Sequence, residues 1–266
     1  MLDSDLELPV TLDWRDDETI AIVTLNRPRV RNAINGAMAD AVIETLGALR
    51  TRPTLRCLIL QGAGSQAFSA GADLVERRGL PAAGLTAHTD VIADAAHALA
   101  DFPVATIAAV RGYALAGGAE WAIACDLRVF ADDAVIGFPE VRIGVFPGAG
   151  GVVRLPRLVG ESAARDLLLT GRRIEAAEAW RLGLADRLVT AADVESTALA
   201  VARTIAKNAP LAVRAIKRTL SETVGVSEPI AHAISRRLRQ PLDATDDYRE
   251  GLSAFAEKRP ANFSGS

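Results

Sequence analysis

Three short segments of almost uninterrupted apolar residues constrain the fold of this chain more than any other feature. They are Thr19 to Leu25 ("TIAIVTL"), Leu55 to Gln61 ("LRCLILQ") and Val104 to Val110 ("VATIAAV"). The segments are rich in β-branched residues and lack the alternation of a strand with one wet face, so they are typical of strands buried on both faces. Such strands occur in parallel sheets covered by helices, which predicts an α/β fold.

Weaker strand candidates and several helical patterns lie between and after these segments. The strand candidates are Leu127 to Phe130 and Val135 to Phe138, and the helical patterns are Gly36 to Leu49, His88 to Leu99 and Ala119 to Ala124. Helices therefore alternate with strands along the first part of the chain, as they do in α/β proteins.

The pattern changes after Ser162, where four helical patterns follow one another, separated by glycine or proline. We therefore expect the C-terminal third to contain helices only. The chain has 266 residues, enough to bury a full core, and no low-complexity linker divides it. The prediction is one continuous domain, in which residues 1–160 form the core with the active site and residues 161–266 form a helical region.

Charge and composition disfavour several classes of partner. The formal net charge is -3 and no stripe of basic and aromatic residues occurs, which argues against binding to nucleic acid or to an anionic membrane. No apolar run is long enough to span a membrane, and the acidic first residues lack the features of a signal peptide. Cys57 and Cys125 lie within apolar runs, as reduced, buried thiols do. These features predict a cytoplasmic protein.

The sequence does not support three familiar types of site. His88, His97 and His232 show no metal-ligand spacing with each other or with the cysteines, so no metal site is expected. Ser69, in "AFSAG", lacks the first glycine of a hydrolase nucleophile elbow. The segment "GAGSQA" (62–67) matches a dinucleotide fingerprint, but no amphipathic helix opens on its last residue to receive a pyrophosphate. A plain turn is favoured there, and no cofactor is predicted.

The stretch "GYALAGGAEWAIACD" (112–126) places Gly117 and Gly118 directly before Glu120 at the start of a helical pattern. Glycines let the backbone approach a ligand closely, and free amides at a helix start can donate to a developing anion. An acidic residue in a first turn is also stabilised by the helix dipole alone. The stretch is therefore compatible with either an anion-stabilising site or an ordinary helix start.

A second carboxylate, Glu140, lies in "GFPEVRIGVFPGAGG" (137–151), where a helix start behind Pro139 is again an alternative. The segment "FSAGADL" (68–74) offers another turn of small residues with free amides. Two amides can hold a thioester carbonyl as it becomes an enolate, and two carboxyl groups can divide the proton transfers between them. The chain thus contains the parts that enolate chemistry requires.

Several segments resemble the enoyl-CoA hydratase/isomerase (crotonase) superfamily in order and spacing, over nearly the whole chain. They are "LNRPRVRNAI" (25–34), "AFSAGADL" (67–74), the run from Gly112 to Gly151, "RLPRLVG", "AWRLGLADRLV" and "GLSAFAEKRPANF". The resemblance implies a spiral of ββα units whose C-terminal helices assemble into homotrimers, which often pair into hexamers. It also implies that the amides of Ala72 and Gly117 form an oxyanion hole and that Glu120 and Glu140 are the acid–base pair of a hydratase.

The resemblance further implies which residues contact coenzyme A. They are Arg27, Arg29 and Arg31 beside the phosphates, Ala70, Asp73 and Leu74 at the adenine pocket, and Lys258 at a phosphate, in some relatives from a neighbouring subunit. Clustered arginines also make independent sense, because an anionic nucleotide needs local cations in a mildly acidic protein. A solvated loop remains the alternative for any one of these arginines.

Taken together, the sequence predicts an enoyl-CoA hydratase that acts on an acyl-CoA substrate without a cofactor. The alternatives are an isomerase of the same family, which usually needs only the carboxylate at Glu140, and a noncatalytic relative that binds acyl-CoA or RNA. Three residues depart from the common family pattern. Ala116 replaces a glycine, which we expect to be harmless if Gly117 supplies the amide. Trp121 replaces a leucine, and Arg111 replaces an asparagine.

Overall fold

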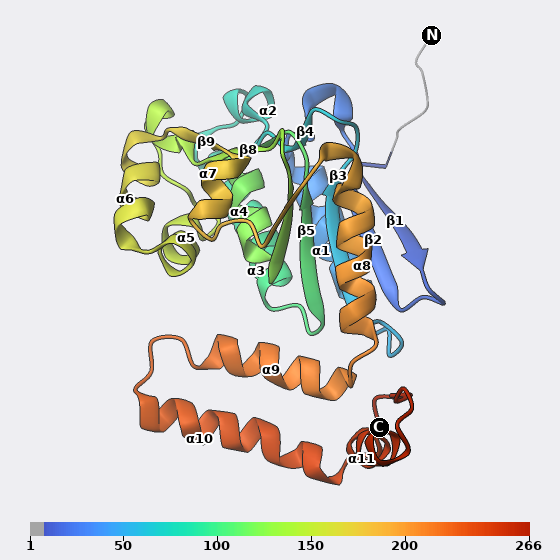
Figure 1. Ribbon diagram of the computed structural model, residues 1–266. Coiled ribbons are helices and arrows are strands. Elements are labelled where there is room, and N and C mark those ends of the chain that lie inside the picture. Colours follow the sequence, from blue (N-terminus) through green and yellow to red (C-terminus); the bar gives the residue numbers. More distant parts are fainter. Residues whose placement is uncertain (1–7) are drawn as a thin grey trace.

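The computed structural model describes residues 8–266 and confirms an α/β fold built on two sheets (Figure 1). The six-stranded sheet has the order β1-β2-β3-β5-β7-β10, and the four-stranded sheet has the order β4-β6-β8-β9. Pairing is parallel except between β1 and β2 and between β8 and β9. The strands are β1 Val10–Arg15, β2 Ile20–Leu25, β3 Cys57–Gly62, β4 Ala67–Ser69, β5 Ala105–Val110, β6 Tyr113–Leu115, β7 Leu127–Ala131, β8 Val135–Gly137, β9 Arg173–Glu175 and β10 Arg187–Val189.

From β3 to β8, consecutive strands alternate between the two sheets, which is the repeat predicted by the family resemblance. The pairs β3 and β4, β5 and β6, and β7 and β8 each give one strand to the large sheet and the next to the small sheet. The three apolar segments form β2, β3 and β5, and every residue of β5 is buried. "GAGSQA" spans the turn between β3 and β4, as expected for a turn after a strand rather than a dinucleotide site.

Helices cover the large sheet and extend beyond it. They are α1 Gly36–Arg50, α2 Leu74–Arg78, α3 Ala82–Ala100, α4 Gly117–Ala124, α5 Gly151–Val159, α6 Glu161–Thr170, α7 Ala176–Arg181, α8 Val194–Ala206, α9 Pro210–Glu222, α10 Glu228–Arg239 and α11 Asp246–Glu257. Short 3₁₀ helices are η1 Pro28–Val30, η2 Pro139–Ile143, η3 Ala191–Asp193 and η4 Gln240–Ala244. Helix α8 packs across β2, β3, β5 and β7, whereas α9, α10 and α11 lie below the sheets in Figure 1.

The expectation that only helices follow Ser162 is wrong. Strand β9 pairs with β8 and strand β10 pairs with β7, so the chain returns to both sheets before the last helices begin. Each strand has only three residues, and its pairing partner, rather than its own sequence, gives it a strand conformation. The proposed division at residue 160 stays a prediction.

Three further expectations concern the cysteines, membrane-spanning helices and the first residues of the chain. Cys57 and Cys125 are buried free thiols, as predicted. Within residues 8–266 no helix combines the length and the hydropathy needed to cross a membrane. The prediction that no signal peptide is present depends largely on residues 1–7, which lie outside the described part of the chain.

The close approach of α4 to β4 generates a stability prediction. A methyl group added at Gly118 would lie 2.6 Å from both Cβ and the carbonyl oxygen of Ser69, whereas one added at Gly47, within α1, would meet nothing within 4 Å. We expect Gly118→Ala to lower the free energy of unfolding by at least about 2 kcal/mol, because backbone must move. Gly47→Ala should raise it by about 1 kcal/mol through helix propensity.

Urea unfolding of the two variants and the wild type checks this prediction. Gly47→Ala is the matched control, because it makes the same change inside a helix without the close contact. Equal stabilities for the two variants would contradict the packing described here.

Candidate active site

One cavity of about 650 Å³ receives most of the residues singled out from the sequence. The segment before α2, helix α3, the start of α4 and the stretch from η2 to α5 all contribute to its wall. Of the predicted site residues, the cavity is lined by Ala70, Ala72, Leu74, Gly117, Glu120 and Glu140. The tertiary structure therefore brings together the two turns and the two carboxyl groups that lie up to 70 residues apart in the chain.

The turn from β6 into α4 is strained at Ala116. This residue has φ 50° and ψ −127°, a region that residues with a Cβ rarely adopt. The adjoining turn fits closely, because a methyl group on Gly71 would lie 2.7 Å from Cβ of Ala116. The replacement of glycine by Ala116 is accommodated in an unfavourable backbone conformation, and the expectation that it is harmless to the site stays a prediction.

Ala72 and Gly117 both line the cavity, and their backbones lie close together. Hydrogen bonds from Ile34 N to Gly71 O and from Asp73 N to Ile34 O, both 2.8 Å, fix the peptides on either side of Ala72. A methyl group on Gly117 would lie 3.8 Å from the nitrogen of Ala72. Within residues 8–266 neither amide donates a hydrogen bond to another group of the chain. Two unused N–H groups therefore lie close together at the cavity wall.

Two polar residues that the sequence analysis did not select hold this turn in place. Asn32 is fully buried, and its Nδ2 donates to the carbonyls of Ala63 (3.0 Å) and Ala67 (2.9 Å). Ser69 Oγ donates to the carbonyl of Asn32 (2.8 Å) and accepts from Gly71 N (3.2 Å). Buried polar groups with all their bonds made rigidify the backbone they join. The sequence offered little indication of this role, since Asn32 and Ser69 are only small polar residues within the motifs 25–34 and 67–74.

Glu120 is 2 % exposed and is bound by the backbone. Its Oε1 accepts hydrogen bonds from Ala149 N and Gly151 N, each 2.7 Å long. Burial raises the pKa of Glu120, while the two amide donors and the nearby guanidinium of Arg154 act in the opposite direction. The segment is itself supported by Arg154, whose Nη1 donates to Ala149 O at 2.8 Å. The pKa of Glu120 is raised on balance, so these contacts offset only part of the effect of burial on the ionised form.

Glu140 lies on η2 in a different environment. It is 8 % exposed, and its Oε2 has no hydrogen-bond partner in the described part of the chain. Burial, together with the neighbouring charge of Glu120, raises the pKa of Glu140 to about 7. A buried carboxyl group with an unpartnered oxygen favours the protonated form. The two carboxyl groups therefore differ in their readiness to hold a proton.

The residues expected to contact coenzyme A are not all in the cavity. Arg27 Nη1 binds Asp73 Oδ2 at 2.9 Å and the carbonyl of Ala33 at 2.6 Å, so this arginine joins two loops. Arg29 is exposed, and Arg31 lies over the ring of Tyr113, 5.8 Å from its centroid. Lys258 follows α11, which lies below the sheets in Figure 1, and it is not among the residues that line the cavity. Their roles toward coenzyme A stay predictions.

Several polar residues of the cavity were missed by the sequence analysis. Arg77 Nη2 donates to Thr89 Oγ1 at 2.8 Å, and both residues line the cavity, as do Arg142 and Arg173. Arg142 lies two residues after Glu140, and Arg173 pairs with Gly137 across β8 and β9. Charged residues in helices and edge strands usually face solvent, so only the tertiary structure reveals that these three arginines share one cavity.

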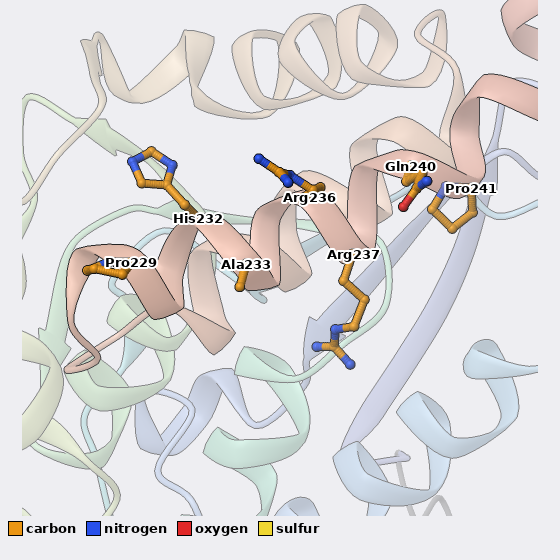
Figure 2. A pocket seen from close by; sticks show the side chains of 7 residues that line it. All are labelled: Pro229, His232, Ala233, Arg236, Arg237, Gln240 and Pro241. Atoms are coloured by element: carbon orange, nitrogen blue, oxygen red, sulfur yellow. The ribbon is translucent and has the colours of Figure 1, made fainter.

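A second hollow of about 620 Å³ lies on the C-terminal helices (Figure 2). All of its lining residues belong to α10 and the η4 turn after it: Pro229, His232, Ala233, Arg236, Arg237, Gln240 and Pro241. In Figure 2 the side chains of Arg236 and Arg237 point to opposite sides of the helix. None of the residues selected from the sequence lies there, and no carboxyl group lines it. The cavity that contains Glu120 and Glu140 is therefore the candidate active site.

Comparisons with known proteins agree with this choice of fold and family. A family model for enoyl-CoA hydratase/isomerase matches residues 15–266. The chain is 38% identical over 253 residues to human enoyl-CoA hydratase domain-containing protein 2, mitochondrial, covering 94% of this chain and 87% of that protein. It is 37% identical over 261 residues to an enoyl-CoA isomerase/hydratase of Zymoseptoria tritici, covering 92% and 84%.

Solved structures of enoyl-CoA hydratases also resemble this chain in fold. The crystal structure of enoyl-CoA hydratase from Bacillus anthracis superposes with a TM-score of 0.95 at 35% identity, covering 97% of this chain and 100% of that one. An enoyl-CoA hydratase structure from Mycobacterium tuberculosis matches with a TM-score of 0.86 at 37% identity, covering 98% of this chain and 100% of the other. Matched along almost its whole length in sequence and in fold, the chain belongs to the enoyl-CoA hydratase/isomerase family.

Proposed function

We propose that this protein hydrates 2-enoyl-CoA thioesters by syn addition of water, or catalyses the reverse dehydration. The observation that carries the proposal is the pair of buried carboxyl groups, Glu120 and Glu140, in one cavity with the two unused amides of Ala72 and Gly117. An isomerase would need to move only one proton between two carbons. A second buried carboxyl group held by backbone amides favours the activation of water.

In the proposed reaction the thioester oxygen accepts hydrogen bonds from the amides of Ala72 and Gly117. Each such donor typically stabilises the developing enolate by about 3 kcal/mol. Glu120, ionised, removes a proton from water as the water oxygen bonds to C3 of the enoyl group. Glu140, protonated, delivers its proton to C2. Transfer of the proton from Glu120 to Glu140 through solvent restores the starting state, and the proposed reaction uses no metal ion or nicotinamide.

The remainder of coenzyme A is proposed to leave the cavity past Ala70 and Leu74. The adenine would lie near Asp73, and the phosphates near Arg27, Arg29 and Arg31, with Lys258 reaching them only from another subunit. This arrangement depends on the family resemblance and on the cations near the turn. A cytoplasmic location also stays a prediction from the sequence.

The glutamate pair gives the most direct prediction. Glu120→Gln and Glu140→Gln should each lower kcat for hydration by at least about 100-fold, because each removes one of two proton transfers. Acyl-CoA binding should change little, since neither carboxylate is proposed to bind the nucleotide. The double variant should be at most about tenfold slower than the slower single variant, because the groups act in one step.

The measurement is loss of the conjugated enoyl absorbance, with the reaction run in oxygen-labelled water. Full hydration by Glu120→Gln would refute the role of that residue. Migration of the double bond without entry of solvent oxygen would identify an isomerase instead.

The raised pKa of Glu140 generates a pH prediction. If Glu140 donates a proton, kcat/KM for hydration should fall about tenfold per pH unit above about pH 7. The same proton affects stability, because between pH 4.5 and about 7 the folded protein retains a proton that the unfolded chain releases. The wild type should therefore lose up to about 3 kcal/mol of stability over this range as the pH rises.

Glu140→Gln is the matched control for the stability measurement, since it keeps the shape and cannot titrate. Its stability should lack this loss, so the difference in stability between the two proteins should change with pH in urea titrations. A difference that stays constant from pH 5 to pH 8 would contradict the protonated state assigned to Glu140.

The exposed C-terminal helices motivate a prediction of assembly. Apolar side chains on α9, α10 and α11 remain exposed in the single chain: Ile216, Leu220, Ile230, Leu252 and Phe255. Exposed apolar residues gathered on neighbouring helices are typical of protein–protein contact surfaces. We expect a homotrimer or a homohexamer, and a light-scattering mass of one 28.0 kDa chain would contradict this prediction.

A further inference from the structure

Three arginines line the candidate active-site cavity without an acidic partner. Among residues 8–266, no carboxylate lies within ion-pair distance of Arg77, Arg142 or Arg173. The contrast with an adjacent residue is clear, because Arg172 pairs with both Asp166 (2.6 Å) and Glu178 (2.7 Å). These three thus belong to the arginines that form no ion pair in the described chain, and they share the cavity that contains the two glutamates.

Arg77 is the most enclosed of the three arginines. It is half-buried, and its one side-chain hydrogen bond within the described chain goes to a neutral hydroxyl, Thr89 Oγ1, at 2.8 Å. A guanidinium offers five donors, and most of those of Arg77 remain available to a ligand. Thr89 in turn lies beside the segment that binds Glu120, since a methyl group on Gly148 would lie 2.8 Å from Thr89 Cγ2. Through Thr89, Arg77 therefore adjoins the segment whose amides bind Glu120, within the same cavity.

Arg142 and Arg173 are exposed residues of the same cavity wall and belong to the segments around Glu140. Arg142 belongs to η2, which carries Glu140, and Arg173 is paired with Gly137 just before η2. The arginines proposed to meet the phosphates of coenzyme A lie on a separate loop, where Arg31 borders a different hollow beside Tyr113. The three cavity arginines are thus separate from the cations proposed for the nucleotide.

The charge in the cavity is unlike that of the whole chain. The chain has a net charge of -3, but the cavity wall carries three arginines and only two carboxyl groups, of which Glu120 is already bound by two amides. An excess of unpaired guanidinium groups in a confined site favours an anionic ligand, and a guanidinium binds a carboxylate through two parallel hydrogen bonds.

From these observations we infer that the acyl group of the natural substrate ends in a carboxylate, so that the substrate is the coenzyme A monothioester of an unsaturated dicarboxylic acid. Arg77 binds this carboxylate, with Arg142 and Arg173 adding positive charge around it. The inference rests on the proposed function for the identity of the thioester, but recognition of the acyl carboxylate can be measured without turnover.

Binding of two saturated ligands tests the inference. Glutaryl-CoA carries a terminal carboxylate and butyryl-CoA does not, and neither can be hydrated. The wild type should bind glutaryl-CoA at least about tenfold more tightly in calorimetry, because a hydrogen-bonded charge pair contributes about 1.5–3 kcal/mol. Arg77→Met should reduce this preference by about 10- to 100-fold, and Arg77→Lys should retain part of it.

Arg78→Met is the matched control, because Arg78 is the next residue of α2, is exposed and does not line the cavity. It should preserve the preference. Thermal unfolding of all variants separates a loss of recognition from a loss of folding. If Arg77→Met is poorly folded, the partial retention by Arg77→Lys still tests the inference, and the absence of any preference in the wild type overturns it.

The phosphates of coenzyme A are the other anions that these arginines could bind. If Arg77→Met weakens both CoA ligands equally, and the effect disappears with the pantetheine thioesters of the same acids, the arginine binds a phosphate and the inference is overturned. A preference for glutaryl over butyryl that persists in the pantetheine thioesters supports it.

Hydration assays separate this inference from the proposed function. If the wild type hydrates crotonyl-CoA but shows no preference for glutaryl-CoA, the inference fails and the hydratase assignment stands. If the wild type prefers glutaryl-CoA but hydrates neither crotonyl-CoA nor glutaconyl-CoA, the inference stands and the hydratase assignment fails.

Discussion

The contact between the turn after β4 and the start of α4 is the constraint on which the rest of the site depends. Gly118 lies against Ser69, and Gly71 lies against Ala116, with no space for a larger side chain at either glycine. This contact brings the amides of Ala72 and Gly117 close together. The strained backbone of Ala116 is retained because both flanking turns are fixed by their own hydrogen bonds. Glycine is required at these two positions because the two backbone segments lie too close together for a larger side chain.

The start of α4 also positions Glu120, one member of the carboxyl pair, against backbone amides. Glu120 points from the first turn of α4 to the amides of Ala149 and Gly151, so its charge is compensated by the backbone. Burial raises the pKa of both groups, but Glu140 receives no such donor to Oε2 within the described chain, and its pKa rises to about 7. Two acids of the same type thus acquire different proton affinities from their hydrogen-bond partners. Acid–base chemistry at neutral pH needs this kind of difference.

The net charge of the whole chain and the charge of the cavity wall differ in sign. The whole chain is mildly acidic, which predicts no long-range attraction for anions. The cavity is locally cationic, because Arg77, Arg142 and Arg173 face it without acids beside them. Net charge therefore carries no information about the charge that a bound substrate meets. That charge depends on which arginines the fold leaves unpaired.

The sequence by itself determined the parallel sheet and the composition of the site. Continuous apolar runs at β2, β3 and β5 can be satisfied only by burial on both faces, and the glycines and glutamates of α4 and η2 are local features of short motifs. Tertiary structure alone decided that β9 and β10 are strands, because three-residue segments take their conformation from a pairing partner. It also decided that Asn32 and Ser69 hold the turn before Ala72, that Arg27 binds Asp73, and that Arg77 lines the cavity. Each of these depends on a distance between residues far apart in the chain, and sequence periodicity reports only the environment of near neighbours.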